Sequence, residues 1–231
     1  MKRIRSEGEA DLGLTHREIR QKARNDIVSR ETILSPEFGR YSKNKEYKQK
    51  QSIAMNNPTL LKNLRVIPDF PIPGIQFQDI STLFDNPECL HIMRDEVVDY
   101  YKDKGITKVV GLESRGFLLG PIVASELSAG FVMARKPGKL PGNVVSYDYS
   151  KEYGKDTICM ISDSINDDDV VLIHDDLLAT GGSMRAAYEL VKKFNPKKIY
   201  ISFIIELTIE GLHGRDVFAD TDAEISTLLT I

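Results

Sequence analysis

We predict an α/β fold, in which a central, mostly parallel sheet is flanked by helices, from three features of the sequence. Short apolar runs alternate with segments of helical periodicity from residue 90 onward. The composition is 41% hydrophobic and 28% charged, and no window approaches the roughly 18 consecutive apolar residues of a membrane span. A length of 231 residues allows one well-filled domain plus an appendage. Together these features favour a soluble α/β domain.

The first alternating elements are a helix, a strand, a second helix and a second strand. The first helix ends at Lys104-Gly105, and its periodic apolar residues are Leu90, Met93, Val97, Tyr100 and Tyr101. TKVVG (107–111) follows as a short buried strand. GFLLGPIVASELSAG (116–130) predicts the second helix and FVMA (131–134) the second strand. The inward positions of the second helix are then Leu118, Leu119, Ile122, Val123 and Leu127.

The next segment reads as a β-flap followed by a further strand, helix and strand. Two β-rich runs, 144–149 and 157–161, surround the polar sequence KEYG. VVLI (170–173) predicts a strand, helical spacing from Met184 to Phe194 predicts a helix, and KIYISFII (198–205) predicts another strand. Ligands of such sheets bind beyond the carboxyl ends of the strands, so we expect residues 175–183 at the site.

The charge of the chain divides at Met55. Residues 1–54 contain 13 Lys or Arg against 8 Asp or Glu, whereas the remainder contains 18 against 26. A basic segment of this kind can bind nucleic acid, but its polarity and weak periodicity favour a poorly ordered or non-native extension. We therefore predict a catalytic domain over residues 55–231 and an N-terminal extension over residues 1–54.

The N-terminus and the cysteines indicate the compartment. The basic start MKRIRSEGEADLGL has no apolar run behind it, which argues against a secretory signal. Cys89 and Cys159 are far apart and lack the spaced partners of a zinc site, as expected in a reducing compartment. We predict a cytoplasmic protein.

The stretch VVLIHDDLLATGGSMRAAYEL (170–190) leads from the predicted strand through a Gly-Gly-Ser turn into the predicted helix. The first turn of a helix exposes backbone N–H groups, and the helix dipole adds partial positive charge. Gly181 and Gly182 let the backbone approach an anion and adopt positive φ, while the hydroxyls of Thr180 and Ser183 can donate hydrogen bonds. The turn is therefore expected to bind phosphate.

Two adjacent carboxylates, Asp175 and Asp176, come just before this turn. They would repel a phosphate unless something polyhydroxylated or cationic lay between them, and a ribose or a magnesium ion meets that need. The stretch therefore predicts a cradle for ribose 5-phosphate. A capping box in a surface turn is the alternative, which the complete string at a strand-to-helix junction makes less favoured.

The same stretch resembles the phosphoribosyl-diphosphate motif of type I phosphoribosyltransferases, most closely those that act on adenine. Further matches occur in that family's order and cover nearly all of residues 60–210. They are DFPIPGIQFQDIS (69–81), GLESRGFLLGP (111–121), ARKPGKLPG (134–142), YSKEYGK (149–155) and IIELT (204–208). The resemblance implies the type I phosphoribosyltransferase fold, with the β-flap over the site.

The resemblance also implies an activity and a set of substrate contacts. Enzymes of this family join adenine to phosphoribosyl diphosphate with Mg²⁺, giving AMP and pyrophosphate. By similarity, Asp175 and Asp176 hold the ribose hydroxyls, and the 5-phosphate binds Ala179, Thr180, Gly181, Gly182 and Ser183. The expected pyrophosphate contacts are Glu113, Ser114, Arg115, Arg135, Lys139 and Tyr153. Magnesium would be held mainly by the substrate, and the peptide bond between Glu113 and Ser114 is often cis in relatives.

The resemblance places adenine between Phe77 and Leu177, with backbone groups of Gln76 and Gln78 at its edge. Glu152 of the flap is then the catalytic carboxylate, which relays a proton near N7. Without the matched motifs, Phe77 would be read as core, Glu152 as a solvated hairpin tip and the ARKPGKLPG loop as a basic surface turn.

Some residues depart from the family pattern or receive no chemistry. Gln78 stands where many relatives carry arginine, and His174 where an apolar residue is usual. We expect His174 to be a buried neutral imidazole bonded to backbone rather than a catalytic group. Glu206 and Arg215 match a pattern of packing and subunit contacts. His16, His91 and His213 show no metal-ligand spacing.

Two alternatives remain open on the sequence. One is a phosphoribosyltransferase for hypoxanthine, guanine or xanthine, although no lysine for a 6-oxo group lies near Phe77 or Leu177 in the matched pattern. The other is a transcription regulator that senses phosphoribosyl diphosphate, for which LTHREIRQKARNDIV is too short to be a convincing helix-turn-helix. The expected partners are small-molecule substrates and a second copy of the chain, without nucleic acid or membrane.

Overall fold

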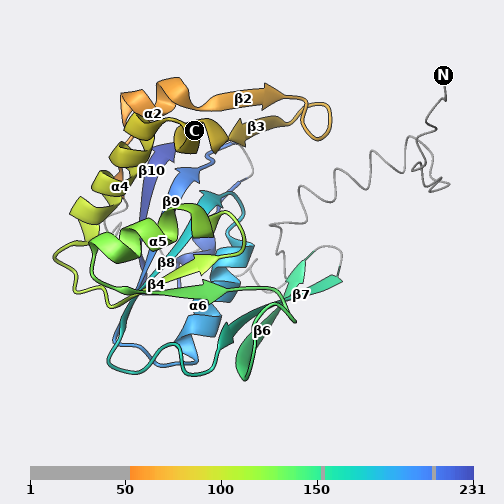
Figure 1. Ribbon diagram of the computed structural model, residues 1–231. Coiled ribbons are helices and arrows are strands. Elements are labelled where there is room, and N and C mark those ends of the chain that lie inside the picture. Colours follow the sequence, from red (N-terminus) through yellow and green to blue (C-terminus); the bar gives the residue numbers. More distant parts are fainter. Residues whose placement is uncertain (1–52, 152–153, 210–211) are drawn as a thin grey trace, which may run out of the picture.

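A computed structural model of the chain describes residues 53–151, 154–209 and 212–231. In this part of the chain a main sheet of six strands has the order β1-β10-β9-β8-β4-β5 (Figure 1). Its strands are β1 (Ile53–Ala54), β4 (Lys108–Leu112), β5 (Gly130–Ala134), β8 (Val170–Leu178), β9 (Lys198–Glu206) and β10 (Glu224–Thr230). Every neighbouring pair is parallel, which confirms the predicted sheet.

Helices cover both faces of this sheet. One face carries α2 (Pro58–Asn63), α3 (Ser81–Asp85), α4 (Pro87–Tyr101) and α5 (Gly116–Glu126), and the other carries α6 (Gly182–Lys192). Neighbouring strand residues point to opposite faces, so Val109 packs in the core beneath α2–α5 and Val110 packs in the core beneath α6. Because both faces are covered, the central strands are apolar on both sides, as in the sequence of β4 and β8.

Two antiparallel hairpins accompany the main sheet. β6 (Val144–Lys151) pairs with β7 (Gly154–Ile161) and confirms the predicted hairpin of the flap, although residues 152–153 at its tip lie outside the described residues. β2 (Arg65–Pro68) pairs with β3 (Gln76–Asp79), which the sequence patterns do not predict. Figure 1 shows the β2–β3 hairpin extending at the end of the sheet where the strands point.

The boundaries of three predicted elements differ from those observed. β8 continues to Leu178 rather than ending at Ile173, because its pairing with β9 extends that far, and Asp175 and Asp176 therefore lie inside the strand. α5 ends at Glu126 rather than at residue 130, since Ser128 adopts a positive φ of 54°. Leu118, expected on the inward face, is 47% exposed, so that prediction was wrong.

The described chain also contains two strands that the sequence analysis did not predict. β10 packs between β9 and β1, and its buried positions include hydroxyl residues that hide its apolar character. β1 joins Ile53 and Ala54 to β10, and a short 3₁₀ turn, η2 (Asp216–Phe218), precedes β10. The predicted extension over residues 1–54 lies outside the described residues except for Ile53 and Ala54. None of the described helices is long and apolar enough to cross a membrane.

Candidate active site

A cavity of about 340 Å³ opens over the carboxyl ends of β8, β4 and β5. Its floor includes Leu112 and Ala134, the last residues of β4 and β5. Many of the residues predicted for the site line it: Glu113, Ser114, Arg115, Arg135, Asp175, Asp176, Leu177, Gly181 and Ser183. The location agrees with the rule that open parallel sheets bind ligands beyond their carboxyl ends.

Asp175 and Asp176 form a pair of adjacent carboxyl groups near the end of β8. The backbone N–H of Asp176 donates to Oδ1 of Asp175 over 2.9 Å, and Arg115 forms an ion pair with Oδ2 of Asp176 over 3.0 Å. Burial, and after it the charge of Asp176, raises the pKa of Asp175 well above its usual value. Hydroxyl donors or a cation beside the pair would relieve the burial and repulsion that raise this pKa.

The turn after β8 has the geometry of an anion site. Gly181 adopts the left-handed conformation, with a φ of 80°, and serves as the N-cap of α6 without a side-chain hydrogen bond. The first turn of α6 contains no acidic residue, so nothing there offsets the positive end of the helix dipole. Gly182 is the first residue of the helix and does not have positive φ, which corrects the expectation for that glycine.

Other residues of the predicted turn have different positions. Gly181 and Ser183 line the cavity, whereas Ala179, Thr180 and Gly182 lie in the same turn without lining it. Ala179 is buried, and Gly181, directly after Thr180, adopts the left-handed conformation at the start of α6.

Glu113 and Arg135 form a bidentate ion pair at the rim of the cavity. Nε of Arg135 donates to Oε2 of Glu113 over 3.1 Å, and Nη2 donates to Oε1 over 2.8 Å. The hydrogen bonds from Arg135 hold the pKa of Glu113 below its usual value. The peptide bond between Glu113 and Ser114 is cis, as expected. Two of the predicted pyrophosphate contacts are thus paired with each other within one chain.

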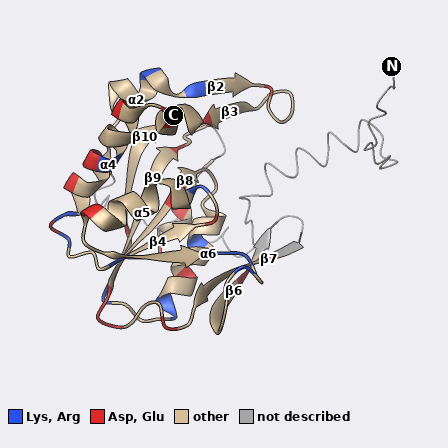
Figure 2. Ribbon diagram, viewed as in Figure 1, with Lys and Arg blue, Asp and Glu red and all other residues tan. Residues whose placement is uncertain are grey.

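The segment that follows β5 supplies further positive charge. Figure 2 shows basic residues there. Lys136 lines the cavity and forms an ion pair with Asp156 of β7. Lys139 is exposed and does not line the cavity, but its carbonyl accepts a hydrogen bond from Arg135 over 3.2 Å. The sequence analysis did not single out Lys136. Its position two residues after the end of β5 could have indicated that it lies at the site.

The flap contributes Tyr149, Thr157 and Ile158 to the cavity wall. The hydroxyl of Tyr149 donates to Oδ2 of Asp156 over 3.1 Å and has a side-chain hydrogen bond with Ser183 of the turn. The flap is thus bonded to the phosphate-binding turn, a contact that the sequence analysis missed. Glu152 and Tyr153, which were predicted as catalytic and pyrophosphate-binding residues, lie outside the described residues.

The residues predicted for adenine occupy two parts of the structure. Leu177 lines the cavity, whereas Gln76, Phe77 and Gln78 lie on β3, outside its lining. The ring of Phe77 is partly exposed and meets the ring of Phe70 edge to face, with centroids 5.1 Å apart. The β2–β3 hairpin therefore presents an aromatic pair at the carboxyl end of the sheet.

His174 and the Glu206–Arg215 pair have structural environments. His174 is 1% exposed, and burial lowers its pKa to about 4, so the imidazole is neutral at pH 7, as predicted. A contact with the backbone of Ser202 opposes that shift, but neither ring nitrogen completes a hydrogen bond of normal geometry, contrary to the predicted backbone bond. Arg215 donates twice to Glu206, each time over 2.6 Å, which fits the packing role expected of that pair.

Within the described residues, no group of three or more His, Cys, Asp or Glu side chains has the arrangement of a metal site. Asp175, Asp176 and Glu113 are carboxylates that line this cavity, where a cation carried by a substrate would meet them. The raised pKa of Asp175 is consistent with such use, because a divalent ion would relieve the repulsion within the pair.

Comparison with known proteins identifies the domain. A family model described as "Phosphoribosyl transferase domain" matches residues 79–221. An adenine phosphoribosyltransferase from Phocaeicola vulgatus is 60% identical over 177 residues, which cover 77% of this chain and 100% of that protein.

Solved structures show the same likeness. A Giardia lamblia APRTase in complex with 9-deazaadenine aligns with a TM-score of 0.70 and 41% identity, over 78% of this chain and 99% of the other. An adenine phosphoribosyl transferase from Trypanosoma brucei, in complex with AMP, pyrophosphate and ribose-5-phosphate, aligns with a TM-score of 0.68 and 29% identity, over 78% of this chain and 82% of the other. These fold relatives confirm the predicted fold class.

Proposed function

Because this chain belongs to the phosphoribosyltransferase family and matches members named adenine phosphoribosyltransferase, we propose that it converts adenine and phosphoribosyl diphosphate to AMP and pyrophosphate. The observation that carries the proposal is the adjacent pair Asp175–Asp176, which lies in one cavity with the left-handed turn at Gly181. Neither a 6-oxopurine enzyme nor a transcription regulator receives support from these relatives.

The 5-phosphate and the ribose occupy adjacent parts of the cavity in this proposal. Backbone N–H groups of residues 179–183 bind the phosphate at the positive end of α6. Asp175 and Asp176 accept hydrogen bonds from the ribose hydroxyls. The ribose hydroxyls take the place of the water that burial of Asp175 excludes, so the substrate favours the ionised form of the pair.

Departure of pyrophosphate leaves positive charge on the ribose ring, as in oxocarbenium-like transition states. The acidic pair beneath the ring stabilises that charge, and its fixed place on β8 means that little reorganisation is needed. The leaving group is a polyanion, for which Arg115, Arg135 and Lys136 are the nearby cations, with Ser114 and Lys139 in the same loops. Arg115 is paired with Asp176, and Arg135 is paired with Glu113. When pyrophosphate binds, these arginines exchange their carboxylate partners for phosphate oxygens.

Adenine would lie between Leu177 and the aromatic ring of Phe77 on the β2–β3 hairpin, with backbone groups of Gln76 and Gln78 at its edge. For Phe77 to reach the base, the hairpin must close over the cavity, which its place at the end of the sheet allows. Glu152 of the flap would relay the proton that leaves adenine, and Tyr153 would contact pyrophosphate; both lie outside the described residues.

Magnesium fits this site as a partner of the substrate. Asp175 and Asp176 are oxygen donors of the kind that Mg²⁺ prefers, and most of the coordination would come from the diphosphate and the ribose. When bound, the ion supplies positive charge that offsets the charge of the departing pyrophosphate.

We also propose a cytoplasmic homodimer. Leu118 on α5 and Met133 on the edge strand β5 are exposed apolar residues, and Met133 lies two residues before Arg135. Cys89 and Cys159 are both buried and unbridged, as is usual in a reducing compartment.

The activity can be tested with purified protein, Mg²⁺, phosphoribosyl diphosphate and one of four purine bases. We expect pyrophosphate release with adenine and at least about tenfold less with hypoxanthine, guanine or xanthine, because a site built for one set of hydrogen bonds rejects another. Release with every base except adenine would overturn the substrate, and failure of any base to react would overturn the activity.

A further inference from the structure

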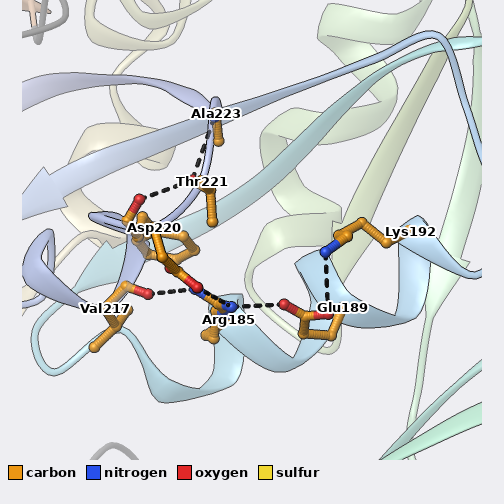
Figure 3. Close-up of polar contacts among 8 residues, drawn as sticks. Arg185, Glu189, Lys192, Val217, Asp220, Thr221 and Ala223 are labelled. Carbon is orange, nitrogen blue, oxygen red and sulfur yellow. Dashed lines mark hydrogen bonds and ion pairs between the residues drawn. The ribbon is translucent and has the colours of Figure 1, made fainter. Parts of the chain in front are cut away.

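Arg185 joins α6 to the segment that precedes β10. Figure 3 shows its guanidinium pointing toward Val217 and Asp220, with Glu189 one turn further along the helix. Nη1 donates to the carbonyl of Val217 over 2.7 Å and also to Oδ1 of Asp220, while Nη2 donates to Oδ2 of Asp220 over 3.0 Å and to Glu189 over 2.7 Å. One side chain thus bonds to two residues that follow it by 32 and 35 positions in the sequence, Val217 and Asp220.

The charges around Arg185 show that it is not built to bind an anion. Its cation meets the carboxylates of Glu189 and Asp220, and Glu189 also pairs with Lys192 over 3.7 Å. The guanidinium does not line the cavity. A cation near a helix N-terminus is unfavourable by itself, so its place here calls for another reason than the dipole.

The segment that Arg185 holds is in direct contact with the phosphate-binding turn. A Cβ added at Gly181 would lie 2.5 Å from the carbonyl oxygen of Gly214 and 2.8 Å from Cγ2 of Val217. A Cβ added at Gly214 would collide in turn with the carbonyl oxygen of Ala179. Two glycines therefore let the two backbones pack against each other, and the turn has no room to move toward this segment.

Aromatic packing reinforces the same contact. The ring of Tyr188 on α6 meets the ring of Phe218 edge to face, with centroids 6.3 Å apart, and both rings belong to the core. The guanidinium carbon of Arg185 lies 5.7 Å from the centroid of the Tyr188 ring. Arg185 therefore packs over the aromatic contact between α6 and residues 214–220, and its hydrogen bonds join the same two segments.

We propose that residues 214–220 form a buttress that sets the shape of the phosphate-binding turn, and that Arg185 is the positioning residue that holds this buttress against α6. This inference rests on the proposed function. The buttress touches the turn but not the substrate, so its contribution is to hold the N–H groups of residues 179–183 in the geometry that binds phosphate.

The expected consequence is selective for one substrate. Arg185→Gln removes the charge and most of the hydrogen bonds of this side chain, and we expect the KM for phosphoribosyl diphosphate to rise about tenfold. The KM for adenine and kcat should stay within about twofold, because the turn binds the phosphate equally in the ground state and in the transition state. A residue that only stabilised the fold would leave both KM values unchanged at temperatures well below Tm.

Two further variants complete the kinetic test. Asp220→Asn keeps the bond from Arg185 to Val217 and changes an exposed carboxylate, so it should fold and should raise the same KM by about threefold. Lys192→Gln is the matched control, because it removes a charge that pairs with Glu189 at the far end of the same ion-pair chain and acts on Asp220 only through a weaker charge interaction. That control should leave both KM values unchanged.

Hydrogen exchange of the ligand-free protein tests the same idea without the activity. We expect the amides of residues 180–183 to exchange at least about fivefold faster in Arg185→Gln than in the wild type, and equally fast in Lys192→Gln. Unchanged exchange at the turn, or equal increases of both KM values, would overturn the buttress. If the wild-type protein made no AMP while exchange still rose, the proposed function would fail and the buttress would stand.

Discussion

The two ends of the main sheet differ in how their polar groups are satisfied. At the end where the strands begin, Tyr101 is fully buried, and its hydroxyl donates to the carbonyl of Ile201 over 3.0 Å and contacts Oγ of Ser226 over 2.8 Å. Glu224 accepts hydrogen bonds from both Tyr100 and Lys104. Each of these polar groups therefore has a hydrogen-bond partner or a partner of opposite charge.

At the end where the strands finish, like charges lie together. Asp175 and Asp176 are neighbours in one strand, and burial together with the charge of Asp176 raises the pKa of Asp175. The left-handed glycine at residue 181 and the uncapped start of α6 lie beside them. The comparison teaches that the polar groups at the amino end stabilise the fold, while Asp175 at the carboxyl end is in an unfavourable electrostatic environment that a substrate would relieve.

The two ends should also respond to pH with opposite sign. A carboxyl whose folded pKa is raised, as at Asp175, contributes stability at low pH that is lost as the pH rises through the folded pKa. At Glu224, burial raises the pKa, but the hydrogen bonds from Lys104 and Tyr100 outweigh it, and the net pKa is lowered. That group contributes stability above its unfolded pKa of about 4.3, which is lost as the pH falls through the folded pKa.

The largest effect is expected for Asp175→Asn. We expect kcat/KM to fall by about 10²–10³, because a carboxylate that faces the developing positive charge is lost. Asn keeps an oxygen for the N–H of Asp176 but removes the repulsion, so Tm should rise by about 2–4 °C near pH 8. The gain should shrink as the pH falls through the raised pKa of the wild-type carboxyl.

Steady-state kinetics and thermal unfolding at several pH values measure both changes. Asp168→Asn is the control, since it makes the same chemical change at a carboxylate whose side chain is 84% exposed. A variant that lost stability as well as activity would contradict the view that this end of the sheet is arranged for the substrate at the expense of the fold.

Gly181→Ala should have the next largest effect. The φ of 80° strains an alanine, and the new Cβ would lie 2.5 Å from the backbone oxygen of Gly214, so the turn must shift. We expect kcat/KM to fall by about 10–10²-fold, through misplacement of the N–H groups.

Gly105→Ala sharpens this comparison at the other end of the sheet. Gly105 has a φ of 67°, but nothing lies within 4 Å of an added Cβ. This substitution should cost about 1 kcal/mol of stability from backbone strain and leave kcat/KM unchanged. Equal losses of activity in the two glycine variants would show that strain alone, rather than the contact with Gly214, limits the turn.

Tyr101→Phe tests the amino end directly. Loss of the hydroxyl leaves Oγ of Ser226 and the carbonyl of Ile201 with one partner fewer in a buried site, and we expect the free energy of unfolding to fall by about 1–2 kcal/mol. The measurement is urea unfolding at pH 7, with kcat/KM expected within twofold of the wild type. A large loss of activity in a fully folded variant would contradict the view that the amino end serves stability and the carboxyl end serves substrate binding.

The sequence predicts the parts of this structure that depend on local patterns. The strands of the sheet centre follow from apolar runs, and the left-handed turn follows from adjacent glycines at a strand-to-helix junction, as observed at Gly181. β10 was missed because Ser226 and Thr227 are buried in it, and only the tertiary fold supplies the partner that satisfies Ser226. The extension of β8 past His174 likewise depends on pairing with β9.

Long-range pairing accounts for the contacts that sequence patterns did not predict. The Glu113–Arg135 and Arg185–Asp220 ion pairs join residues 22 and 35 positions apart, and no periodicity within a window of the chain indicates them. The bond between Tyr149 and Ser183 depends on where the flap folds back. Residue types at strand ends could be predicted, but their partners required the topology.

The smallest expected effect is that of Glu224→Gln. The variant loses the charge that Lys104 and Tyr100 stabilise, so its unfolding free energy should be lower than the wild type by about 0.5–1 kcal/mol at pH 7. The difference should shrink as the pH falls below the unfolded pKa of about 4.3. Thermal unfolding from pH 8 down to acid pH measures this slope, which is opposite to that of Asp175→Asn. Because the two residues lie at opposite ends of the sheet, their effects should add within about 0.5 kcal/mol in the double variant. A larger departure from additivity would mean that the ends communicate, and the separation of stability from substrate binding would then have to be given up.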